Sequence, residues 1–118
     1  MVRDISEIKR VVKEYGDELM RHNIRITKAI LYGSYARGNP RPYSDIDLII
    51  VSPDLKRFSP LKRQELLSQL TMAIDAPLEV IGYTPEELRH SRGTIFGQII
   101  RETGKVLRGI RFLSWRQS

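Results

Sequence analysis

The chain has 118 residues, of which 41% are hydrophobic and 29% charged, a composition typical of a folded globular protein. This length predicts a single domain over residues 1–118 with one hydrophobic core. No apolar run approaches the roughly 20 residues that cross a bilayer, and the amino terminus lacks the apolar core of a secretory signal. Cysteine is absent, which excludes disulfides and cysteine-based metal sites and is consistent with a cytoplasmic location.

The net charge of +6 is concentrated toward the C-terminus. Residues 1–88 contain 13 basic and 13 acidic side chains, whereas seven basic residues from position 89 onward are balanced only by Glu102. They are Arg89, Arg92, Arg101, Lys105, Arg108, Arg111 and Arg116. Such an excess can attract a polyanion or an acidic protein partner. A solvated basic face that keeps a small protein in solution explains it equally well, so both interpretations stay open.

The first predicted element is a helix that begins at Asp4 and ends near residues 22–23. Residues 4–7, Asp-Ile-Ser-Glu, have the spacing of a capping box, with Asp4 as the N-cap. Apolar residues then recur at helical spacing. Residues 24–32 predict a strand, because they are rich in β-branched side chains and are followed by Gly33.

A short helical turn is predicted next, capped by Ser34, running to Arg37 and ending at Gly38. The sequence Asn-Pro-Arg-Pro at 39–42 cannot continue a helix and predicts a loop. Residues 45–51 predict a second strand, since their nearly continuous aliphatic run is typical of a strand buried on both faces.

A second long helix is predicted from Ser59-Pro60 to Pro77, because proline is favoured at the first helical position and stops a helix that it follows. Its expected buried stripe consists of Leu61, Leu66, Leu67, Leu70, Ala73 and Ile74. Residues 78–83 predict a third strand. The capping box at 84–87 predicts a further helix that breaks near Gly93 and ends at Gly104, followed by a short edge strand at 105–108. Alternating strands and helices indicate an α/β or α+β fold with helices packed on one sheet.

Two carboxylates, Asp45 and Asp47, interrupt the aliphatic second strand. Burying them is unfavourable unless a cation lies between them. Because residues two apart in a strand point to the same face, both side chains can converge on shared cations. Two Mg²⁺ ions about 3.5–4 Å apart are the usual arrangement for nucleotidyl transfer, so the sequence predicts a magnesium site here.

The turn after the first strand is expected to bind the phosphates of a nucleoside triphosphate. Backbone N–H groups at Gly33 and Ser34, together with the serine hydroxyl, lie at a predicted helix start, where anions are favoured. Arg37 is expected to contact the phosphates or, alternatively, to pair with a carboxylate. Glu79, the only acidic residue of the third predicted strand, is expected to bind the second metal or to accept the proton of the attacking hydroxyl. The alternative is a plain turn with solvated carboxylates.

Gly33-Ser34, ten intervening residues and then Asp45-x-Asp47 resemble the minimal nucleotidyltransferase (MNT) branch of the DNA polymerase β-like nucleotidyltransferase superfamily. Residues 84–87 and 100–104 are also similar to that branch. The resemblance implies a small mixed β-sheet flanked by helices, dependence on Mg²⁺, and transfer of a nucleoside monophosphate from ATP or another nucleoside triphosphate. It also implies that Asp45 and Asp47 bind metal and that Glu79 takes the third acidic position, where many members have Asp.

Larger members of that superfamily carry a second, helical domain that holds the base and the acceptor. At this length, those parts are expected to come from a partner or a second copy. The resemblance implies a helical HEPN-type partner and an antitoxin that adenylylates a hydroxyl of that partner. The alternatives are a non-catalytic partner-binding subunit, an RNA-binding module that uses Arg101, Lys105 and Arg108, and transfer to a small molecule such as an aminoglycoside.

Apolar residues in the tail either complete the core or form a subunit contact. They are Ile110, Phe112, Leu113 and Trp115.

Overall fold

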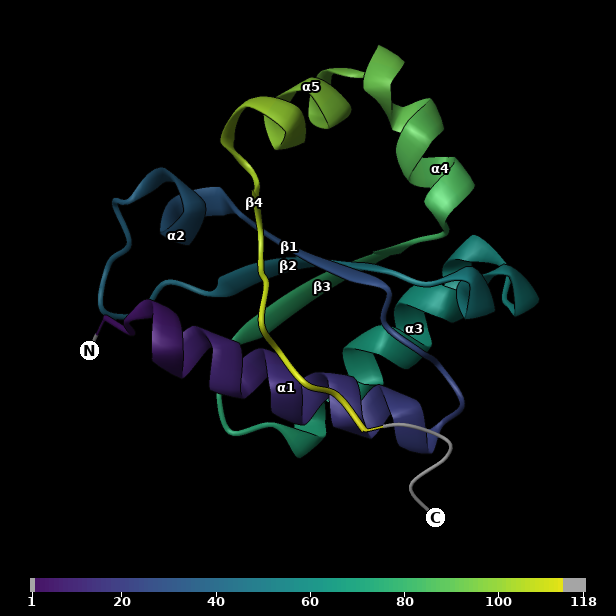
Figure 1. Cartoon of the computed structure of the whole chain (residues 1–118), viewed down its shortest axis with the longest axis horizontal. Coiled ribbons are helices and arrows are strands. Elements are labelled where there is room, and N and C mark those ends of the chain that lie inside the picture. Colours follow the sequence, from purple (N-terminus) through teal and green to yellow (C-terminus); the bar gives the residue numbers. More distant parts are fainter. Residues whose placement is uncertain (1, 114–118) are drawn as a thin grey trace.

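The computed structural model describes residues 2–113. In this part of the chain, four strands form one mixed sheet in the order β3-β2-β1-β4 (Figure 1). β1 (Lys28–Tyr32) pairs antiparallel with both β2 (Ile46–Val51) and β4 (Lys105–Val106), whereas β2 pairs parallel with β3 (Leu78–Tyr83). The mixed sheet is therefore the one expected from the sequence.

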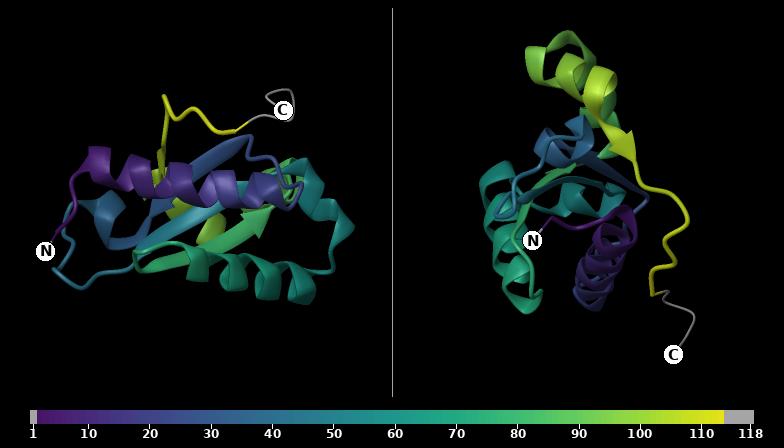
Figure 2. Two further views of the ribbon diagram at one scale, coloured as in Figure 1. Left: turned by 90° about the horizontal axis from the view of Figure 1, so that it is seen from below. Right: turned by 90° about the vertical axis from the view of Figure 1, so that its left-hand side faces the viewer.

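Helices cover both faces of the sheet (Figure 2). α1 (Ile5–Arg21) and α3 (Pro60–Leu70) lie on one face, and α4 (Pro85–His90) and α5 (Ile95–Thr103) lie on the other. The α1–α3 face carries the larger core, which includes Val12, Tyr15, Leu19, Leu31, Leu48, Ile50 and Leu67. The α4–α5 face carries the smaller buried cluster of Ile30, Ile49, Val51 and Ile100. α1 and α3 are longer than α4 and α5, so the α4–α5 face has the less extensive helical cover.

The capping box predicted at the first helix is confirmed in its main contact, because the Asp4 carboxylate accepts the Glu7 N–H at 2.9 Å. The strand expected from residue 24 begins only at Lys28. The N–H of Ile24 bonds instead to the Leu19 carbonyl of α1 at 3.0 Å, and the next N–H along the chain bonds to the Asp54 carboxylate. Residues 24–26 therefore connect α1 to the sheet, and only Thr27, whose N–H donates to the Val51 carbonyl at 2.9 Å, continues its hydrogen bonding.

The stripe predicted for the second long helix is wrong in part. α3 ends at Leu70 and continues as the 3₁₀ turn η2 (Thr71–Ala73), and Leu61 is 70% exposed. Ala73 is exposed as well. Arg63 takes the buried place in the first turn, where its guanidinium donates to the carbonyls of Gly82 and Leu55. Hydrophobic periodicity cannot identify a charged side chain that is buried by such contacts.

The short helix α2 (Gly33–Arg37) follows β1 directly. Tyr32 occupies its N-cap position without a side-chain hydrogen bond, so the cap predicted at Ser34 is wrong. Gly38 ends the helix with a positive φ of 78°, as expected for a glycine C-cap.

The break predicted near Gly93 is present as the 3₁₀ turn η3 (Ser91–Gly93) between α4 and α5. In the tail, Ile110 and Phe112 pack against the larger core, whereas Leu113 is 38% exposed. Trp115 lies outside the described residues. Within residues 2–113, no helix is both long and apolar enough to cross a bilayer.

Candidate active site

Two of the predicted site carboxylates lie side by side on adjacent strands. Asp47 of β2 is the register partner of Glu79 in β3. Because side chains alternate along a strand, Asp47 shares its face with Ile49, which belongs to the buried cluster under α4 and α5. Asp47 is half-buried and Glu79 is exposed. The pair therefore lies where β2 and β3 begin, at one end of the face that α4 and α5 cover.

This environment disfavours a negative charge on Asp47. Burial is the largest cause that raises its pKa to about 6, followed by the charges of Glu79 and Asp45. A hydrogen bond between the Asp47 and Glu79 carboxyl groups acts in the same direction, while the Arg37 guanidinium lowers the pKa. A cation bound here would compensate the negative charge that the protein leaves largely unmatched.

Asp45 stands next to this pair but is not part of the strand. It precedes β2, is exposed, and lies close enough for its charge to act on Asp47. Across residues 2–113, no group of three or more His, Cys, Asp or Glu side chains is arranged to hold a metal ion. Two carboxylates thus converge with a third nearby, and the three-ligand set of Asp45, Asp47 and Glu79 stays a prediction.

Gly33 brings the start of α2 into contact with the Asp47 carboxylate. Its φ is +73°, and a Cβ atom at this position would collide with Oδ2 of Asp47. The antiparallel register explains this approach, since Tyr32, the residue before the glycine, is the partner of Asp47. Ser34, half-buried in the first turn of α2, follows immediately. The glycine-serine turn therefore lies against the start of the strand that carries Asp47.

Tyr32 forms a wall of this site and connects it to α5. Its ring makes an edge-to-face contact with Phe96, with centroids 5.6 Å apart and an interplanar angle of 90°. Burial, followed by the charges of Asp47, Glu79 and Tyr83, raises the pKa of Tyr32 to about 12. The phenol therefore keeps its proton at neutral pH. Phe96 could not be identified from the sequence, because its role depends on α5 folding over the sheet.

A cavity of about 440 Å³ lies beside the carboxylates, lined by Tyr32 and Glu79 together with α3 residues such as Gln64 and Ser68. The Gln64 side chain donates to the Val80 carbonyl at 2.8 Å, which holds α3 against β3 on this side. Glu79, though not Asp47, thus lines a space large enough for part of a substrate.

The model of the nucleotidyltransferase domain family matches residues 5–104, a segment that contains all the predicted site residues. This chain belongs to the nucleotidyltransferase domain family. A candidate protein adenylyltransferase of Methanocaldococcus jannaschii is 33% identical over 64 residues, which are 52% of this chain and 73% of that protein. The nucleotidyltransferase activity and the family predicted from the Gly-Ser and Asp-x-Asp motifs are therefore confirmed.

Two solved structures resemble this nucleotidyltransferase. A toxin-antitoxin solved with AMP-PNP is 27% identical, with a TM-score of 0.56 over 86% of this chain and 73% of that one. A candidate nucleotidyltransferase from Sulfolobus solfataricus has a TM-score of 0.62 over 92% of this chain and 90% of that one. It is 18% identical and therefore shows the fold alone.

Proposed function

We propose that this nucleotidyltransferase transfers AMP from ATP to a hydroxyl of a partner protein and acts as the antitoxin of a toxin–antitoxin pair. The observation that carries the proposal is the Asp47–Glu79 pair on adjacent strands, with Gly33 close against the Asp47 carboxylate. The relative from M. jannaschii supports a protein acceptor, since it is named for adenylyl transfer to protein. The toxin-antitoxin solved with AMP-PNP supports both the nucleotide and the pairing with a toxin, for which we propose a helical HEPN-type protein.

The donor set suits Mg²⁺, a hard cation that prefers oxygen ligands. We assign Asp47 and Glu79 to it, with Asp45 as the third carboxylate; burial and then the neighbouring carboxylates raise the pKa of Asp47, and a bound cation would offset both effects. Mg²⁺ keeps several waters and phosphate oxygens, so a complete protein cage is not required. When bound, two ions would neutralise the triphosphate and favour the deprotonated form of the attacking hydroxyl.

The protein's own groups would bind and orient the reactants. Backbone N–H groups of Gly33 and Ser34 would hold the β- and γ-phosphates beside the carboxylates. Arg37, whose charge already acts on Asp47, would balance the charge that develops on the pyrophosphate. The hydroxyl oxygen forms a bond to the α-phosphorus, the bond to pyrophosphate breaks, and Glu79 accepts the hydroxyl proton.

Labelled ATP tests the proposal directly. The chain is incubated with Mg²⁺, ATP labelled at the α-phosphate, and the protein encoded by the adjacent gene. We expect label on that protein, and we expect Asp47→Asn to remove it while Glu65→Gln, an exposed carboxylate on α3, retains it. Neutralisation of the partner without any label would show a non-catalytic binding subunit instead. Equal labelling by Asp47→Asn would disprove the assigned site.

A further inference from the structure

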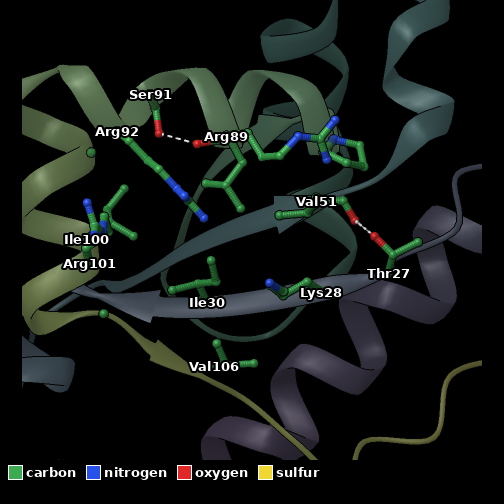
Figure 3. Close-up of a pocket in the computed structure, with 14 residues that line it drawn as sticks. Thr27, Lys28, Ile30, Val51, Arg89, Ser91, Arg92, Ile100, Arg101 and Val106 are labelled. Carbon is green, nitrogen blue, oxygen red and sulfur yellow. Dashed lines mark hydrogen bonds between the residues drawn. The ribbon is translucent and has the colours of Figure 1, made fainter.

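A second cavity, of about 530 Å³, lies on the face of the sheet that α4 and α5 cover, between β1 and the segment from α4 to α5 (Figure 3). Its apolar wall includes Ile30, Val51, Leu88, Ile100 and Val106. Its charged lining residues are all cations, namely Lys28, Arg89, Arg92 and Arg101. We call it the basic cavity. No acidic residue is among the described residues that line it.

The basic cavity is separate from the carboxylate site. In the β1–β2 register, Tyr32 pairs with Asp47 at one end, and Lys28 pairs with Val51 at the other. The two pairs are four residues apart, a distance of about 13 Å along the strands. Lys28 and Val51 line the basic cavity, whereas none of the predicted catalytic carboxylates does.

The four cations of the basic cavity are unneutralised within the described structure. The ion pairs formed among residues 2–113 involve Lys13, Arg21 and Arg63 instead. Figure 3 shows the Arg92 side chain extending from η3 toward β1, where the Lys28 side chain lies below it. All four cations are exposed, so water screens their mutual repulsion, but an anion bound between them would be attracted by all four charges at once.

We propose that the basic cavity binds the phosphate groups of a small molecule of nucleotide size. Its volume falls within the range of ligand pockets, about 300–1,000 Å³. Arginine guanidinium groups bind phosphate through paired hydrogen bonds, and the apolar wall can contact an uncharged body such as a base. A single strand of nucleic acid would require a basic groove that continues along its backbone. Here the cations surround one cavity, which favours a compact ligand.

Binding without Mg²⁺ tests this proposal independently of nucleotidyl transfer. Tripolyphosphate, ATP, AMP and adenosine are titrated by calorimetry into the full chain at low ionic strength. We expect tripolyphosphate and ATP to bind, AMP to bind more weakly, and adenosine not to bind. The double variant Arg92→Gln/Arg101→Gln should weaken tripolyphosphate binding about tenfold or more, because it removes charged hydrogen-bond donors.

Arg108→Gln is the matched control, since Arg108 is exposed in the same basic segment but does not line the cavity. It should leave the affinity unchanged. Amide NMR of the wild-type chain locates the ligand without any variant. Shifts should occur at Lys28, Arg92 and Arg101.

Three results would overturn the proposal. Shifts confined to Gly33 and Ser34 would place the phosphates at the carboxylate site. Equal weakening by Arg108→Gln would indicate a diffuse basic surface. Tighter binding of a single-stranded oligonucleotide than of tripolyphosphate, dependent on Arg108, would favour a nucleic-acid interface.

Discussion

The Asp47 carboxyl group lies opposite Glu79 across the parallel strands β2 and β3, and this neighbour is one reason why its pKa rises to about 6. Burial is the larger reason, and the charge of Asp45 adds to both. A site built in this way is unfavourable in the free protein, because it keeps negative charges together in a half-buried place. The same burial and the same neighbouring negative charges that destabilise the folded protein would favour the binding of a cation.

We predict that Asp47→Asn stabilises the metal-free protein at neutral pH. Because the folded-state pKa of Asp47 is raised above its ordinary value of 3.8, the folded state loses stability as the pH rises from 3.8, and the full penalty is present once the pH exceeds about 6. Below pH 3.8 the group is protonated in both states and this penalty is absent. The variant should therefore be more stable at pH 7.5 by about 1 kcal/mol, after allowance for solvent screening, and the difference should vanish near pH 3.5.

Urea unfolding in EDTA at the two pH values measures this difference. Glu65→Gln, which also removes one negative charge but lies exposed on α3, is the control and should change the stability at pH 7.5 by less than about 0.5 kcal/mol. A variant less stable than the wild type at pH 7.5 would show that the negative charges around Asp47 do not destabilise the folded state.

Mg²⁺ together with a non-hydrolysable ATP analogue should reverse the order of stability. Ligands that bind only the folded state stabilise it by about 2.7 kcal/mol at a hundredfold excess over Kd. We expect the wild type to gain this stability and Asp47→Asn to gain little, because its carboxamide cannot compensate a divalent cation. Thermal unfolding with and without EDTA provides the measurement. An equal rise in Tm for both proteins would remove Asp47 from the metal site.

Local patterns in the sequence were sufficient for the starts of α1, α3 and α4 and for the strand that carries Asp47, but not for the end of α3 or the cap of α2. The capping residues Asp4 and Thr84 lie within four residues of the groups they bond, so their effect is visible in a short segment. The order of Gly33-Ser34 and Asp45-x-Asp47 was informative for a different reason. The two motifs contact each other in the fold: Gly33 follows the end of β1, and the antiparallel pairing of β1 with β2 brings it against Asp47 at the start of β2.

Features that depend on distant segments could not be predicted. Arg63 is buried because carbonyls from two other elements accept its N–H groups, and no periodicity in α3 signals this. Lys28 joins the arginines of the basic cavity only because α4 and α5 fold over β1. The sequence indicated a basic C-terminal segment, but it could not separate Arg92 and Arg101, which line a cavity, from Arg108, which does not.

Gly33→Ala should impair activity more than Gly38→Ala does. Both glycines have a positive φ, so alanine costs about 1–2 kcal/mol at either position. At Gly33 the new Cβ also displaces the Asp47 carboxylate, whereas nothing lies within 4 Å at Gly38. Moving a catalytic group by about 1 Å can cost a hundredfold in rate. We expect a loss of about that size in kcat for Gly33→Ala, measured by pyrophosphate release, and near wild-type kcat for Gly38→Ala.

Similar kcat values for these two alanine variants, with both proteins folded by circular dichroism, would contradict this role for Gly33. The close approach of α2 to Asp47 would then be dispensable for the reaction.

Arg63→Met should destabilise the protein strongly, although methionine suits both a helix and an apolar environment. The guanidinium donates to the carbonyls of Gly82 and Leu55 and to the Glu87 carboxylate, and it is 7% exposed. Removing it leaves two buried carbonyls without these donors and separates the first turn of α3 from the start of α4. A loss of about 3 kcal/mol in the free energy of unfolding is expected from urea denaturation.

Lys62→Met on the same helix is the matched control, since Lys62 is exposed and its side chain makes no hydrogen bond or ion pair within the described structure. It should change stability by less than about 0.5 kcal/mol. If the two variants were equally stable, the contacts of Arg63 would contribute no more to the free energy of unfolding than the exposed side chain of Lys62 does. The strong effect is expected because burial prevents water from replacing the lost donors. A charged residue can occupy this place in α3 because the carbonyls and the Glu87 carboxylate accept its hydrogen bonds.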